Sequence, residues 1–198
     1  MKVTRYLFKK ITSLSYIFQC WDQFRRGKRK RKDVQCFERH LEDRLFQLQH
    51  DLITLQYEHA PYHHFNVSDP KQRRISKASV RDRLVHQIIH GVLSDFLDQK
   101  FIFHSLSSRL GKGTHFGVLQ LQKMIRQLSK NGKQPCYALK MDIKRFFDTV
   151  DHAILKALLW KNIRDEKTLK IIDTIIDSFR KDPLKNVGIP LDSVVTRF

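Results

Sequence analysis

The residue of this chain best placed for chemistry is an aspartate near the end of a short apolar segment. Asp142 is the second-to-last residue of the segment 136–143, which has the length of a buried strand. Burial penalises a carboxylate charge unless a cation compensates it. Two Mg²⁺ ions held by carboxylates and phosphate oxygens catalyse many phosphoryl transfers. Asp142 is therefore a candidate metal ligand, with the backbone carbonyl of Ile143 close enough to help, although a lone strand-end aspartate can also be structural.

Other polar residues have simpler interpretations. Asp148 and Asp151 each come just before a predicted helix, where a short carboxylate accepts hydrogen bonds from free backbone N–H groups. His86 and His90 are four residues apart on a predicted helix, but the sequence offers no obvious third metal ligand. We therefore expect capping from the aspartates, and packing or phosphate contact from the histidines.

The charge of the chain indicates a polyanionic partner. It has 38 Lys and Arg against 20 Asp and Glu, a formal net charge of +18 and a pI near 10.1. Seven of the eight residues 25–32 are basic, as in a solvated loop that either binds nucleic acid or has no specific partner. An anionic membrane surface would attract the same charge, but no stretch reaches the roughly 18 apolar residues of a spanning helix.

The N-terminus and the cysteines suggest an intracellular setting. Residues 1–24 mix basic residues with short apolar runs, so we see no secretory signal. Cys20, Cys36 and Cys136 are odd in number and widely spaced, which fits neither a disulfide framework nor a zinc site. We expect free thiols in a reducing compartment and a cytoplasmic location.

Apolar periodicity predicts an α+β protein with a mostly helical front. Apolar spacings of three and four predict a long helix after a cap at Asp33, and branched and aromatic content predicts a strand after Pro61. The Asn131–Gly132 pair predicts a turn before the run that contains Asp142. Helices are predicted over 34–55, 80–97, 115–128, 152–160 and 167–179, and strands over 62–67 and 136–143.

The segment around Asp142 resembles the first palm motif of reverse transcriptases. Residues 142–152 are similar to the pattern Asp-Ile-x-x-Phe-Phe-x-x-Ile-Asp-His of the bacterial retroelement group, which includes group II intron, retron and diversity-generating enzymes. Five further blocks resemble successive fingers and palm blocks of that family in the same order, namely 69–76, 80–86, 101–105, 109–115 and 188–191. The resemblance covers roughly residues 60–191 and implies an RNA-directed DNA polymerase.

The resemblance assigns roles to individual residues. Lys71 and Arg73 match fingers positions that hold the triphosphate of the incoming nucleotide, a task that suits cations. Phe147 matches the bulky residue that excludes a 2′-hydroxyl. Asp142 becomes the first catalytic carboxylate and, with Ile143, a Mg²⁺ ligand. Contacts to template or primer phosphates are expected from four further cations, Arg81, Arg83, Arg109 and Lys112.

The chain also departs from the family pattern. The downstream Tyr-x-Asp-Asp hairpin does not occur before Phe198, and Asp192-Ser193 stand where Gly-Asn usually follows. We therefore expect an N-terminal fragment in three parts: a basic helical region 1–60, fingers 61–135 and an incomplete palm 136–198. The expected partners are an RNA template, a DNA primer and deoxynucleoside triphosphates, with any accessory protein left open. Two Mg²⁺ ions are expected only in a complete palm, so this chain alone should be inactive. The alternative is a non-catalytic basic remnant that binds nucleic acid.

Overall fold

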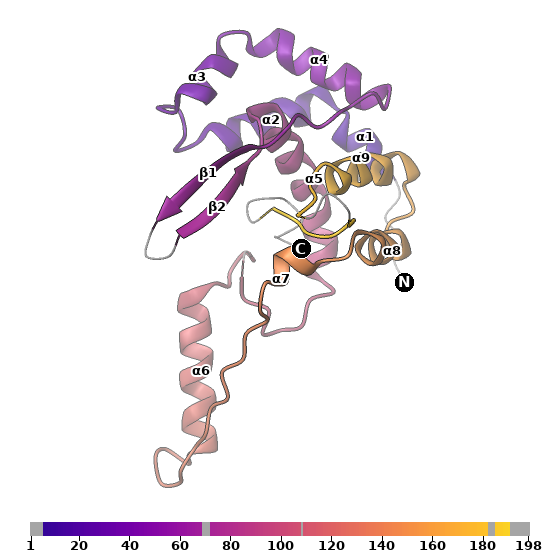
Figure 1. The fold of residues 1–198 in the computed structure, drawn as a ribbon. Helices are drawn as coiled ribbons and strands as arrows, with labels where there is room; N and C mark the ends of the chain where they lie inside the picture. The colour runs from indigo at the N-terminus through magenta and orange to yellow at the C-terminus, as the bar shows by residue number, and fades with distance from the viewer. Residues whose placement is uncertain (1–5, 69–71, 108, 182–184, 191–198) are drawn as a thin grey trace.

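Helices form most of the described chain, and a two-stranded sheet projects from them (Figure 1). The computed structural model describes residues 6–68, 72–107, 109–181 and 185–190. The α+β class predicted from the sequence is confirmed, and none of the helices described is long and apolar enough to cross a bilayer. The elements are α1 (Leu7–Ile11), α2 (Leu14–Arg25), α3 (Lys32–Glu38), α4 (Leu41–Ile53), β1 (His63–Ser68), β2 (Gln72–Lys77), α5 (Val80–Asp98), α6 (Thr114–Leu128), α7 (Phe146–Thr149), α8 (His152–Asn162) and α9 (Glu166–Asp177).

Helix α5 is the element around which the N-terminal helices pack. It contacts α1, α2 and α3, and its apolar positions three and four residues apart are buried, including Leu84, Ile88 and Leu93. Full burial of each such side chain stabilises the fold by roughly 1.5–3 kcal/mol. At its start, the Ser79 hydroxyl accepts a hydrogen bond from the Asp82 N–H at 3.1 Å, which caps the helix. The predicted helix 80–97 is therefore confirmed.

The core continues from these helices into the C-terminal part of the chain. Helix α9 contacts α1 and α8, and its residues Leu169, Ile172 and Ile176 belong to the same buried cluster as the core of α5. The carboxylate of Asp165 accepts from the Thr168 N–H at 3.2 Å and from the Phe8 N–H at 2.9 Å. One side chain thus caps α9 and fastens it to the first turn of α1.

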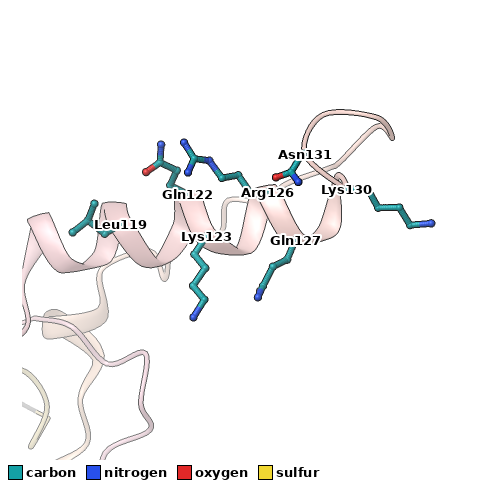
Figure 2. A pocket seen from close by; sticks show the side chains of 7 residues that line it. All are labelled: Leu119, Gln122, Lys123, Arg126, Gln127, Lys130 and Asn131. Carbon is teal, nitrogen blue, oxygen red and sulfur yellow. The ribbon is translucent and has the colours of Figure 1, made fainter.

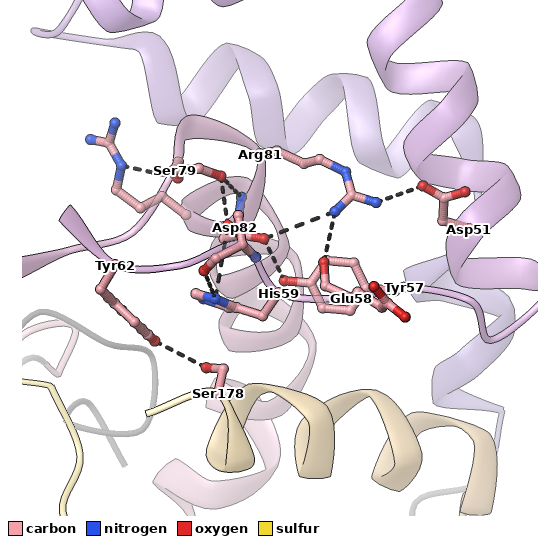
Figure 3. Close-up of polar contacts among 11 residues, drawn as sticks. Asp51, Tyr57, Glu58, His59, Tyr62, Ser79, Arg81, Asp82 and Ser178 are labelled. Atoms are coloured by element: carbon pink, nitrogen blue, oxygen red, sulfur yellow. Dashed lines mark hydrogen bonds and ion pairs between the residues drawn. The ribbon is translucent and has the colours of Figure 1, made fainter. Parts of the chain in front are cut away.

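A buried carboxylate fixes the segment that leads into the sheet. The side chain of Asp82 is fully buried and accepts hydrogen bonds from the Tyr57 hydroxyl at 2.8 Å, the Ser79 hydroxyl at 2.6 Å and the Ala60 N–H at 3.3 Å (Figure 3). Burial of Tyr57 beside this carboxylate raises the pKa of its phenol, which stays a donor. Residues 57–60 are therefore tied to the first turn of α5.

The sheet is an antiparallel hairpin that extends away from the helices (Figure 1). Its register pairs Val67 with Arg73 and Asn66 with Arg74, and most of its residues are exposed. Successive side chains of a strand point to opposite faces, so Arg73 and Arg74 lie on different faces of β2. The strand predicted over 62–67 is confirmed as β1.

The predicted strand over 136–143 does not form. These residues have neither helical nor strand structure, and the side chains of Tyr137, Leu139 and Met141 are 80–92% exposed. A strand needs a neighbour to satisfy its backbone groups, and no described segment lies alongside this one as a partner strand. The apolar residues are present, but no strand among the described residues pairs with this segment.

The neighbouring helix α6 also lacks the predicted buried face. It runs away from the other helices (Figure 1), and no residue described within it is buried. The helix itself was predicted correctly, but its apolar positions lie in solvent, with Val118 at 58% and Leu128 at 66% exposure. Periodicity predicts an apolar face but does not supply the surface that covers it.

The long helix predicted over 34–55 is instead two helices. Helix α3 packs against α5, whereas α4 packs against α2, so the chain turns at Arg39 and His40 to reach both partners. Asp33 lies inside the first turn of α3 instead of capping a helix, and its carboxylate binds Lys77 at 2.8 Å and Arg83 at 2.6 Å.

The buried imidazole of His86 should make stability sensitive to acid. Neither ring nitrogen has a hydrogen-bond partner in the described chain, and burial, followed by the nearby His59, lowers the pKa of His86 to about 3. Asp82 opposes this shift, whereas Arg83 adds to it. The unfolded chain, with an ordinary histidine pKa near 6.5, binds the extra proton first, so stability falls as pH drops from about 6.5 toward about 3.

Replacing His86 with leucine should remove this acid sensitivity. The free energy of unfolding, measured by urea titration, is plotted against pH for the parent and for His86→Leu. Between pH 4 and 6 the slope of the variant should be smaller than that of the parent by up to about 1.4 kcal/mol per pH unit. The matched control is His50→Leu, because His50 is an exposed helical residue. An unchanged pH slope in His86→Leu would contradict the assignment.

Candidate functional site

Two segments that are far apart in sequence lie side by side through backbone hydrogen bonds. The N–H of Gly188 donates to the carbonyl of Val150 at 2.8 Å, and the N–H of Ile189 donates to the carbonyl of Phe147 at 2.8 Å. A third bond runs from the His152 N–H to the Asn186 carbonyl at 3.0 Å. The structure therefore joins two of the sequence blocks that carried the family resemblance, 142–152 and 188–191, through their described residues.

Gly188 is required at this junction by its conformation and by its neighbours. Its φ is +98°, a region that favours glycine, and a Cβ there would lie 2.7 Å from the Lys181 Cβ and 3.2 Å from the Lys181 nitrogen. The Lys181 N–H is itself held by the Val187 carbonyl at 2.9 Å. The backbone at Lys181 therefore lies against that of Val187 and Gly188, beside α7.

His152 is a further residue of the junction, and its role was not predicted from the sequence. Its ring is buried, and Nε2 donates a hydrogen bond to the Gly188 carbonyl at 2.7 Å. The preceding residue, Asp151, accepts from the Ile154 N–H at 3.0 Å and caps α8, as predicted. The His that follows a capping Asp was the available signal, but only the fold shows that it binds the segment around Gly188.

A cavity of about 740 Å³ lies between the hairpin and this junction. That volume is in the range of small-molecule sites, which is roughly 300–1,000 Å³. The hairpin, α7 and the segments after α9 all contribute to its wall, which consists of His64, Arg73, Arg74, Ile75, Ser76, Asp148, Phe179, Arg180, Lys181, Ile189 and Pro190.

Two of the three predicted nucleotide-binding residues can be placed relative to this cavity. Arg73 is exposed on β2 and lines it. Phe147 is half-buried in α7, directly before the lining residue Asp148, and its carbonyl is held by Ile189. Lys71 lies outside the described residues.

The predicted metal ligands lie on an exposed part of the chain. Asp142 is exposed in the irregular segment before α7, and Ile143 beside it is 67% exposed. The described residues contain no group of three or more His, Cys, Asp or Glu that could hold a metal ion. Metal binding by Asp142 and Ile143 therefore stays a prediction.

Two of the arginines predicted to contact nucleic acid are paired within the fold. Arg81 binds the Asp51 carboxylate at 2.5 Å and the Glu58 carbonyl at 3.0 Å (Figure 3). Arg83 binds Asp33 at 2.6 Å, and its side chain is 12% exposed. Both guanidinium groups hold α5 to neighbouring segments, and their contact with phosphates stays a prediction.

The other two predicted nucleic-acid contacts lie in the loop after α5. Arg109 forms an ion pair with Asp98 and donates to the carbonyls of Ile102 and Ser105, each at 3.0 Å. The Lys112 ammonium donates to the Phe103 carbonyl and lies 4.4 Å from the centre of its ring. These contacts shape the loop, so here too phosphate binding is a prediction that the fold leaves open.

A second hollow, of about 400 Å³, lies along α6 and is bordered by polar side chains (Figure 2). Lys123 and Gln127 extend from one side of the helix and Gln122 from another, so these groups do not converge on a point (Figure 2). This surface lacks the arrangement of a binding site.

Comparison with known families decides the assignment. A family model described as "Reverse transcriptase (RNA-dependent DNA polymerase)" matches residues 66–188, which include most of the hairpin, all of α5 and Gly188. The chain belongs to the reverse transcriptase family. The matched range covers more than half of the chain and contains the residues that line the cavity, apart from His64, Ile189 and Pro190.

Three curated proteins are similar to this reverse transcriptase family member over part of their length. The Arabidopsis thaliana "Nuclear intron maturase 1, mitochondrial" is 27% identical over 124 residues, 61% of this chain and 16% of that protein. The Saccharomyces cerevisiae "Putative COX1/OXI3 intron 1 protein" is 23% identical over 130 residues, which are 65% of this chain and 15% of that protein. The Schizosaccharomyces pombe "Uncharacterized 91 kDa protein in cob intron" is 30% identical over 129 residues, which are 63% of this chain and 15% of that protein. The matched part of the chain corresponds to about one sixth of each relative.

The close approach of Gly188 to Lys181 can be tested with alanine. Gly132 has a similar φ of +86° but open space around it, so Gly132→Ala should cost only the strain of the left-handed backbone, roughly 1–2 kcal/mol. Gly188→Ala should cost roughly 1–3 kcal/mol more, because its Cβ overlaps Lys181. Urea unfolding of both variants measures the difference. Equal losses of stability would show that the backbone at Gly188 has room for a Cβ.

Proposed function

We propose that this chain provides the nucleotide-facing part of an RNA-directed DNA polymerase. The observation that carries the proposal is the pairing of Phe147 and Val150 with Ile189 and Gly188, beside a cationic cavity whose lining falls mostly within the matched family region. The expected substrates are deoxynucleoside triphosphates, with an RNA template and a DNA primer. In this proposal residues 1–60 form a basic helical region, 61–135 the fingers and 136–198 the beginning of the palm.

The proposed roles follow from position and chemistry. Arg73, whose charge has no carboxylate partner in the described chain, would bind the nucleotide's phosphates. Phe147 would pack against the sugar and exclude a 2′-hydroxyl by bulk. Lys71 stays a predicted phosphate ligand, and Asp142 with Ile143 stay predicted Mg²⁺ ligands. Any such metal site would require carboxylates beyond those that the described residues bring together.

A second element of the proposal is phosphate contact through the loop between α2 and α3. Arg25 is paired with Asp22 and Glu38, but the next cations along the loop are exposed. No ion pair is formed, within the described residues, by Arg29, Lys30, Arg31 or Lys32. Unpaired cations of this kind bind nucleic-acid backbones without reading sequence.

The intron-encoded character of two relatives, by their printed names, supports a retroelement origin for the chain. The bacterial subgroup and the cytoplasmic location stay predictions.

Binding to an RNA–DNA duplex should depend strongly on salt. The logarithm of the association constant should fall linearly with the logarithm of the salt concentration. Replacing Arg29, Lys30, Arg31 and Lys32 with glutamine should reduce the magnitude of this slope by up to about 0.9 for each phosphate that the chain no longer neutralises. The control keeps the charge, with Lys30→Arg and Lys32→Arg together. An affinity that does not change between about 50 and 200 mM salt would refute the electrostatic account.

Sugar selectivity tests the polymerase assignment at Phe147. The ratio of Kd for ribonucleoside over deoxynucleoside triphosphate should fall toward one in Phe147→Ala, because the bulk against the 2′-position is lost. The neighbouring Phe146→Ala is the control, since Phe146 is 49% exposed and its carbonyl is not bonded to Ile189. Equal selectivity in Phe147→Ala and its parent would count against the role. Duplex binding without nucleotide binding would instead favour the non-catalytic remnant.

A further inference from the structure

The cavity beside the junction has cations on two opposing sides. On the hairpin side, Arg74 pairs with Asn66 and shares its face of the sheet with His64 and Ser76, which also line the cavity. On the other side, Arg180 and Lys181 follow the end of α9. The sequence resemblance assigned no role to Arg74, Arg180 or Lys181.

The cations around this cavity are less neutralised than the three arginines that hold α5 and the loop after it in place. Arg81, Arg83 and Arg109 each have a carboxylate partner. Arg74 and Arg180 have none among the residues described, and the only carboxylate that lines the cavity, Asp148, is 3.4 Å from Lys181. Four lining cations therefore face a single lining carboxylate, a balance that favours a ligand with several negative charges.

The position of the second wall is set by contacts with the base of the hairpin. The hydroxyl of Tyr62, directly before β1, lies 3.2 Å from the hydroxyl of Ser178 (Figure 3). The Tyr62 ring meets the edge of Phe179, with ring centres 5.4 Å apart. Arg180 therefore follows two residues that are anchored to the start of the hairpin.

Apolar groups complete the cavity. Phe179, Ile189 and Pro190 contribute apolar surface, and Ile189 is held to Phe147 through the backbone. A site with cations on one part and apolar surface on another suits an anion attached to a ring system better than a bare phosphate. A nucleoside triphosphate has both parts.

We propose that Arg74 and Arg180 are phosphate-binding residues that close on the triphosphate of a nucleotide from opposite sides of the cavity, in addition to Arg73. This rests on the proposed function for the identity of the nucleotide. Arginine suits the task because its planar group donates two parallel hydrogen bonds to phosphate oxygens. Lys181 contributes less, because Asp148 neutralises part of the positive charge of this wall.

The test is calorimetric binding of dTTP, tripolyphosphate and thymidine to the 198-residue chain in EDTA, so that no metal site contributes. Arg74→Gln and Arg180→Gln should each raise the Kd for dTTP about tenfold, equivalent to about 1.4 kcal/mol. Both should weaken tripolyphosphate similarly and leave thymidine unchanged. Asp148→Asn should tighten tripolyphosphate binding, because it frees Lys181.

Two controls separate charge from structure. Arg39→Gln removes another exposed cation, one outside the cavity, and should change the Kd by less than about twofold, since distant surface charges are screened. Arg180→Lys retains the charge but not the two parallel hydrogen bonds, so it should recover only part of the affinity. Urea midpoints confirm that each variant is folded.

The outcomes distinguish this proposal from the proposed function. Unchanged dTTP binding in both Arg74→Gln and Arg180→Gln, with a loss in Arg73→Gln, would overturn the proposal and leave the polymerase assignment in place. Loss of tripolyphosphate binding in these variants, with no sugar selectivity at Phe147, would support the two-sided phosphate site but not the polymerase. Weaker binding of a dT12 oligonucleotide by Arg180→Gln, with unchanged dTTP binding, would assign the cations to a nucleic-acid backbone and also overturn the proposal.

Discussion

The arrangement of the whole site depends on a carboxylate with no access to water. Asp82 is tolerated in the interior because three donors compensate its burial, and two of them come from the linker before the hairpin. Removing one donor would leave a buried acceptor unsatisfied, which costs roughly 1–3 kcal/mol. The direction in which the hairpin leaves the helices, and hence the position of its arginines, follows from this bonding.

The distribution of acidic residues decides where the excess positive charge can act. Asp33, Asp51 and Asp98 pair with arginines that join helices and loops within the fold. Two groups of cations without carboxylate partners in the described chain lie on the loop between α2 and α3 and around the cavity by the hairpin. Part of the excess behind the net charge of +18 is therefore available for contacts with anions at these two places.

Sequence patterns predict correctly those helices and strands whose local periodicity agrees with their packing. The prediction fails where contacts between distant segments determine the structure. Helix α5 was predicted because its apolar spacing agrees with the surface that it buries, and strand β1 because its branched and aromatic residues suit an extended backbone. The helix over 34–55 was wrong because α3 and α4 pack on different partners, which no local pattern records. Of the site, Arg73 and Phe147 were found through motif resemblance, whereas Arg180 and the bond from His152 to Gly188 depend on a fold that joins distant segments.

The isolation of α6 has a consequence for how this helix persists in solution. Its 15 residues bury no side chain, and helices of about 12–15 residues are marginal in water when only their own hydrogen bonds support them. Such a helix is governed by a helix–coil equilibrium of its own and is uncoupled from the cooperative unfolding of the core around α5. Its amide hydrogens should therefore exchange with solvent through local opening, long before those of α5 are exposed.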